Sequence, residues 1–152
     1  MKNTVETAKG VLLFTVICTL FNGILHLAGS AYHFFYAAKL PDFAAEWGVR
    51  VYLPTLLLSL ALYGGTWVLA SKRDFYLLVG ALLLGADFCL CGYTFAANGL
   101  SVLPVCDLVL HALFIVLLVR GYIAAKKLQE QEKIEKTTEE MLKSMMDGKM
   151  DE

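Results

Sequence analysis

Long apolar blocks alternate with short polar connections along the first 125 residues of the chain. The blocks run from about residue 11 to 38, from 51 to 70, from 75 to 97 and from 102 to 125. Each block reaches the length of about 20 residues that a helix needs to cross a bilayer. The blocks do not show the two-residue alternation that is typical of membrane β-strands. The pattern therefore predicts an all-α, polytopic membrane domain over residues 1–125, with four transmembrane helices in an antiparallel bundle.

The pattern changes after residue 125, where mixed charges replace the apolar blocks. Strong helix formers dominate from Ala124 to Lys143. We therefore expect residues 126–152 to continue the fourth helix as a charged, cytoplasmic extension. Its mixed charges favour a solvated helix, and the alternative is that its scattered methionines contact a partner.

Composition agrees with a membrane domain. The 152 residues are 58% hydrophobic and 18% charged, with a mean hydropathy of +0.61. A soluble domain is typically about 45–50% apolar and about 25% charged. The net charge of −1 carries little information, because the charges are segregated along the chain. The lipid bilayer is thus the expected environment, and nucleic acid is not an expected partner.

Basic residues gather on one side of the predicted membrane. Lys2 and Lys9 precede the first block, Lys72 and Arg73 lie between the second and third, and several more lie within residues 120–127. The connections on the opposite side carry balanced charges or none. Because cytoplasmic loops are enriched in Lys and Arg, we expect both termini to face the cytoplasm.

The start of the chain also permits a second interpretation. Residues 1–31 contain a basic start, an apolar run and small residues, as in a cleaved signal peptide. Cleavage there would leave three transmembrane helices. The polar residues Asn22 and His26 within the run, and its continuation beyond residue 31, favour a retained helix.

Polar residues recur every three or four positions in the first block. They are Thr15, Thr19, Asn22, His26, Ser30 and His33. On a helix this spacing places all of them on one face. The second block carries a similar face that includes Ser59 and Tyr63. We expect these faces to turn toward the inside of the bundle, away from lipid.

Ionisable residues add a second feature to this interior. Counting 1.5 Å per residue from the outer boundary places His26, Asp87, Asp107 and His111 roughly 6–12 Å deep, in one layer. An ionised Asp costs about 2.5–3.5 kcal/mol to insert in a bilayer, so such residues are expected to be paired or functional. The candidate ligand-binding or ion-binding residues are His26, Asp87, Asp107, His111, Asn22, Ser59 and Tyr63.

Three functions remain open on this basis. The first is a small membrane protein whose Asp/His core binds or conducts a cation or small solute, as an oligomer or as a subunit of a larger assembly. The second is a metal-binding or haem-binding redox protein that uses His26 and His111 as ligands. The third is a structural or assembly subunit whose polar faces only pack. The sequence lacks the nucleotide-binding and hydrolase motifs, which argues against a conventional enzyme.

Overall fold

The computed structural model describes residues 1–30, 36–98 and 102–147. In these ranges the secondary structure is helical. The helices are α1 (Lys2–Leu27), α2 (Lys39–Ala45), α3 (Val49–Ala70), α4 (Phe75–Asn98) and α5 (Val102–Asp147). The membrane prediction is supported, because α1, α3, α4 and α5 each contain a segment long and apolar enough to cross a bilayer.

Large apolar side chains on the outside of the molecule agree with a lipid environment. On α1, Phe14, Ile17, Phe21 and Ile24 are 47–56% exposed, and α3, α4 and α5 carry similar exposed residues. Contiguous apolar surface of this extent is rare on proteins surrounded by water. The buried residues of the same helices form the core that holds them together.

The first helix differs from the prediction for residues 11–38. It begins at Lys2 and ends at Leu27. Gly29 adopts the left-handed backbone with φ of 71°. The Gly29 N–H donates to the carbonyl of His26 and the Ser30 N–H to that of Leu25, which closes the helix end in the manner of a Schellman motif. His26 is therefore the penultimate residue of α1, and the predicted helix end at residue 38 is wrong.

The other boundaries are close to the prediction. Helices α3 and α4 begin and end within two residues of the expected limits of 51–70 and 75–97. Helix α5 continues without a break from the apolar block 102–125 into the charged extension, as expected. The short helix α2 was not predicted. It lies in the connection between α1 and α3, and Gly48, with φ of 87°, separates it from α3.

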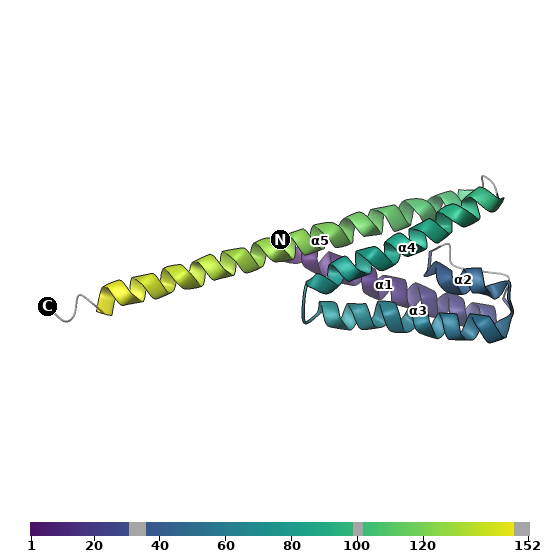
Figure 1. Cartoon of the computed structure of the whole chain (residues 1–152), viewed down its shortest axis with the longest axis horizontal. Helices are drawn as coiled ribbons and strands as arrows, with labels where there is room; N and C mark the ends of the chain where they lie inside the picture. The colour runs from purple at the N-terminus through teal and green to yellow at the C-terminus, as the bar shows by residue number, and fades with distance from the viewer. Residues whose placement is uncertain (31–35, 99–101, 148–152) are drawn as a thin grey trace.

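Figure 1 shows α1, α3, α4 and α5 lying lengthwise beside one another, with α2 at one end of this bundle. Helix α5 runs far beyond the other helices toward the C-terminus. The N-terminus lies near the point where α5 leaves the bundle. Near that end, Gln129 Nε2 donates a hydrogen bond of 3.1 Å to Asp74 in the α3–α4 turn. These segments therefore share the end opposite to α2.

Small residues allow α1 to pack closely against α4 and α5. A side-chain carbon at Gly80 of α4 would come within 2.6 Å of Leu12, and one at Gly121 of α5 would overlap the Cβ of Ala8. Both glycines are thus required by close contact between helices, which membrane helices often achieve with small residues. This packing fixes the relative position of α1 and α5, from which most of the polar interior is built.

Candidate functional site

Residues 36–38, which precede α2, lie against α1 inside the bundle. Tyr36 is 2% exposed, and its hydroxyl lies 2.8 Å from the Thr15 hydroxyl of α1. The main-chain N–H of Ala38 donates to the Thr19 hydroxyl at 2.9 Å. Burial raises the pKa of the Tyr36 hydroxyl, and the hydrogen bond to Thr15 only partly opposes this effect, so the phenol stays neutral. The predicted polar face of α1 therefore holds this segment.

This segment places Lys39, the first residue of α2, inside the bundle. Its Nζ lies 2.5 Å from Oδ2 of Asp107 and 3.4 Å from Oδ2 of Asp42. Burial alone would lower the pKa of the Lys39 ammonium. The negative charges of Asp42 and Asp107 outweigh burial, and the pKa is raised above its ordinary value. Lys39 is therefore a stable internal cation bound to Asp107.

Asp107 and His111 are neighbours on one face of α5, as their spacing predicts. The ring nitrogen Nδ1 of His111 lies 2.9 Å from the main-chain oxygen of Asp107 and 3.1 Å from its Oδ1. Because the main-chain oxygen can only accept, Nδ1 carries the hydrogen. Oδ1 of Asp107 and Nε2 of His111 are buried and accept or donate no hydrogen bond within the described part of the chain. In a neutral ring, Nε2 then bears a free lone pair.

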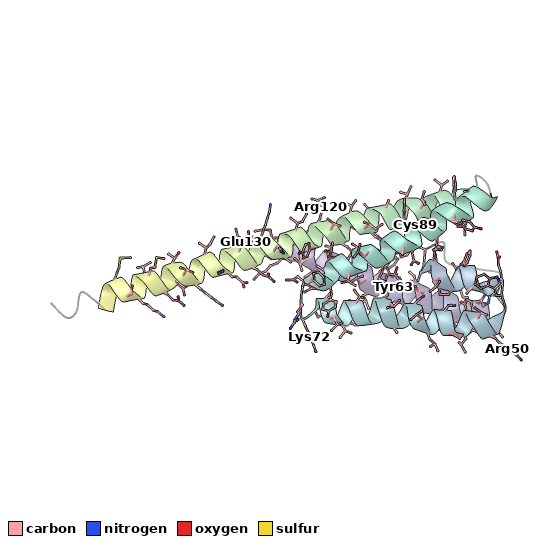
Figure 2. The ribbon with its side chains drawn as sticks, viewed as in Figure 1. Arg50, Tyr63, Lys72, Cys89, Arg120 and Glu130 are labelled. Atoms are coloured by element: carbon pink, nitrogen blue, oxygen red, sulfur yellow. The ribbon has the colours of Figure 1, made fainter. Side chains whose placement is uncertain are left out.

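A second buried carboxylate lies on α4. Asp87 is 5% exposed, and Oδ2 accepts a hydrogen bond of 2.7 Å from the Tyr63 hydroxyl of α3. The main-chain N–H of Lys39 also donates to Asp87. Figure 2 shows Tyr63 within the bundle, between the two ends of α3 that Arg50 and Lys72 mark. Asp87 and Asp107 thus both face the segment around Lys39.

Cys91 of α4 completes a group whose members could hold a metal ion. Its Sγ lies 3.7 Å from Oδ2 of Asp107 and 3.8 Å from Nδ1 of His111. All three residues are buried, and their ligand atoms lie within 4.8 Å of one another. Around a tetrahedral zinc ion with bonds of about 2.0–2.3 Å, ligand atoms are separated by about 3.3–3.8 Å. The group therefore has the atom types of a zinc-like site, and its Sγ and Oδ2 atoms have the matching separation.

The remaining candidate residues from the sequence are not members of the group formed by Cys91, Asp107 and His111. The His26 ring stacks on Tyr52 of α3, with ring centroids 3.9 Å apart, and His26 is not a member of the group around His111. Asn22 of α1 and Ser59 of α3 are buried, as expected for inward-facing residues. His33 lies outside the described residues.

Sequence reasoning did not place Lys39 and Tyr36 in the core. Lys39 was assigned to an outer connection, and Tyr36 to the end of a longer first helix. The balance of charge in the sequence could have predicted that Lys39 lies in the interior. Asp87 and Asp107 have no Lys or Arg in the neighbouring apolar blocks at similar depth, and Lys39 is a nearby cation in the adjoining connection.

A surface groove reaches Lys39, one member of this cluster. It has a volume of about 520 Å³ and lies between α2 and α4. Its lining consists of Lys39, Asp42, Phe43, Glu46, Trp47, Leu90, Tyr93 and Thr94. Two acidic residues thus stand along the approach to Lys39, where they favour cations over anions.

Comparison with known proteins adds no assignment to this geometry. The chain matches no protein-family model, no curated protein and no solved structure. The functional conclusion therefore rests on the buried cluster itself.

Proposed function

We propose that this is an integral membrane protein whose buried Asp/Lys/His/Cys cluster binds a metal cation. In the proposed arrangement the four long helices form an antiparallel bundle with both termini in the cytoplasm, and the cation reaches the cluster from the outer side. The basic residues near the N-terminus and in the α3–α4 turn support this orientation. We also propose that the apolar outer surface allows self-association or contact with a membrane partner.

The imbalance of charge in the cluster supports cation binding most directly. Asp87 and Asp107 supply two carboxylates, and Lys39 contacts Asp107 through its ammonium and Asp87 through its main-chain N–H. With a neutral His111, the three charges leave one negative charge in excess. Uncompensated charge is costly in a membrane interior, so a further cation stabilises the bundle.

The groove between α2 and α4 supports access from one end. Asp42 and Glu46 line it together with Lys39. Acidic side chains along a narrow approach raise the local concentration of cations. The cluster is thus reached through the α2 end of the bundle, and the tight packing of α1 against α4 and α5 separates it from the opposite end.

The redox alternative lacks a comparable supporting observation. A haem held by His26 and His111 needs both rings on one iron. The His26 ring is stacked against Tyr52. In the structural alternative, the cluster only holds α2, α4 and α5 together and binds no cation. The following experiment distinguishes this alternative from cation binding.

The experiment measures thermal unfolding of the full chain in detergent micelles, with a panel of monovalent and divalent metal chlorides. A ligand present at 100 times its dissociation constant stabilises a protein by about 2.7 kcal/mol. We expect at least one metal ion to raise the unfolding temperature of the wild type. Asp107→Asn should lose this response. Asp74→Asn, the same change in the α3–α4 turn, should keep it.

Two results would overturn the proposal. One is a wild-type protein whose unfolding temperature responds to no metal ion in the panel beyond the effect of ionic strength. The other is an Asp107→Asn protein whose metal response equals that of the wild type. Either result would favour a purely structural role for the cluster.

A further inference from the structure

We infer that Cys91, Asp107 and His111 form a site for a zinc-like divalent cation, and that this ion displaces the Lys39 ammonium from Asp107. The inference rests on the cation-binding function proposed above and specifies its ligands. It also assigns to Lys39 the role of an internal counter-ion, which occupies the carboxylate until the metal ion arrives.

The ligand set selects the class of ion. A thiolate, an imidazole nitrogen and a carboxylate oxygen together suit Zn²⁺ and similar divalent ions, whereas Mg²⁺ and Ca²⁺ prefer oxygen ligands alone. The Sγ–Oδ2 distance of 3.7 Å already matches such a site, and the ligand atoms of the three residues lie within 4.8 Å of one another. Three protein ligands leave a fourth position for water or another small ligand.

Unused polar atoms in the same place give an independent indication. Oδ1 of Asp107 and Nε2 of His111 are buried without a hydrogen-bond partner among the described residues. Buried polar atoms are otherwise almost always hydrogen-bonded, so these two atoms are available to a ligand. Because Nδ1 of the neutral imidazole donates its hydrogen to the main-chain oxygen of Asp107, Nε2 is the nitrogen available to the ion.

Lys39 occupies one lone pair that the ion requires, because Nζ lies 2.5 Å from Oδ2 of Asp107. The ammonium does not need to leave the cluster when the ion binds. It already interacts with Asp42 at 3.4 Å, and its main chain contacts Asp87. A short shift of the side chain therefore exchanges one carboxylate partner for another.

The charges balance in this exchange. The metal ion brings two positive charges, and the Cys91 thiol releases its proton to solvent as the Sγ–metal bond forms. The bound ion, the thiolate and the Asp107 carboxylate then form a neutral group. Lys39 and Asp87 form a second neutral pair, and the excess negative charge of the metal-free cluster is removed.

The test uses Co²⁺ as a spectroscopic substitute for Zn²⁺ in the reduced, full-length protein. A cobalt–thiolate bond absorbs in the near ultraviolet, and tetrahedral cobalt gives intense visible bands. We expect both signals in the wild type and in Cys89→Ser, in which an exposed cysteine on α4 is changed. Cys91→Ser should lose the near-ultraviolet band.

Lys39→Met distinguishes displacement from a supporting role for the lysine. Because the metal ion no longer competes with an ammonium, Co²⁺ should bind this variant at least about tenfold more tightly than the wild type. Weaker binding to Lys39→Met would overturn the displacement. If Cys91→Ser does not fold, a second measurement takes its place. Bound Co²⁺ should protect Cys91 of the wild type from an alkylating reagent, and mass spectrometry measures the extent of alkylation.

The possible results distinguish failure of this ligand assignment from failure of the proposed cation binding. A metal-dependent rise in unfolding temperature without a cobalt–thiolate band would keep cation binding and reject Cys91 as a ligand. A thiolate band that persists in Cys91→Ser would place the ion at another cysteine and also reject the site. Equal cobalt affinity in the wild type and Lys39→Met would reject the role assigned to Lys39.

Discussion

Replacement of Lys39 by Met removes the positive charge from the cluster while keeping an unbranched apolar side chain. The ammonium lies 2.5 Å from Asp107 and 3.4 Å from Asp42, and the Lys39 and Asp107 side chains are 15% and 9% exposed. Lys39→Met leaves the buried Asp107 carboxyl without its ammonium partner. We therefore expect a large loss of stability in metal-free buffer.

The size of the loss follows from the burial of the pair. Removal of one partner from a buried ion pair costs about 3–5 kcal/mol. The groove beside Lys39 admits water, so the lower limit of about 3 kcal/mol is appropriate. For a chain of this size, about 2–4 °C per kcal/mol gives a fall in unfolding temperature of roughly 6–12 °C.

A double variant tests whether the carboxylate is the cause. Lys39→Met combined with Asp107→Asn leaves no unpaired charge at this position, so roughly half of the loss or more should be recovered. The assay is thermal unfolding followed by circular dichroism in micelles, with a metal chelator present. Lys72→Met in the α3–α4 turn is the matched control. Two results would refute the reasoning. One is a fall in unfolding temperature for Lys39→Met that is no larger than that of Lys72→Met. The other is a fall for the double variant that equals the sum of the falls for the two single variants.

The pH dependence of the same variant has a defined direction. Burial lowers the pKa of Lys39, but Asp42 and Asp107 outweigh it, so the folded-state pKa lies above the unfolded value of about 10.4. The stabilisation is therefore complete below pH of about 10.4 and is lost as pH rises through the folded-state pKa. The difference in stability between wild type and Lys39→Met should be constant from pH 7 to about pH 10 and shrink at higher pH.

The remaining predictions concern the supporting contacts and the orientation. Tyr63→Phe removes the hydroxyl that donates to the buried carboxylate of α4 at 2.7 Å, and should lower the free energy of unfolding by about 1–3 kcal/mol in chemical denaturation. Gly121→Val should cost about 1–3 kcal/mol in the same assay, because a side chain there overlaps α1. Gly64→Ala, which meets nothing within 4 Å, should instead gain roughly 0.5–1 kcal/mol. In a variant without native cysteines, Glu46→Cys should react with an impermeant reagent from outside the cell and Lys72→Cys only after lysis. The reverse labelling pattern would invert the proposed orientation.

Helices α3 and α4 could be predicted closely from the sequence, because the length of an apolar block is a local property. The end of α1 could not. Apolar and aromatic residues continue to residue 38, and they resemble the rest of the helix in composition. The left-handed Gly29 and the hydrogen bonds from residues 29 and 30 end the helix instead. An apolar run therefore indicates burial, and the glycine within it indicates where the helix stops.

Part of the site could also be predicted from local sequence, and the rest depends on tertiary structure. The contact between Asp107 and His111 follows from their spacing on one helix, and Tyr63 and Asp87 lie on the polar faces that the sequence identified. The position of Lys39 depends on the path of the chain between α1 and α3, which spacing along a helix does not describe. The depth of His26 stays a prediction, because it was counted along a helix that ends at Leu27.

The origin of Lys39 on α2 has a consequence for how the cluster works. A lysine on a transmembrane helix is held at one depth by the hydrogen bonds of that helix, and its ammonium can leave a partner only as far as its side chain reaches. Helix α2 has 7 residues and lies at one end of the bundle, bounded on one side by Gly48. It contacts α3 and α4 rather than forming part of the four-helix core. In the exchange proposed above, the ammonium on Asp107 thus comes from a side chain outside the four-helix core, so its shift to Asp42 leaves the packing of α1 against α4 and α5 unchanged.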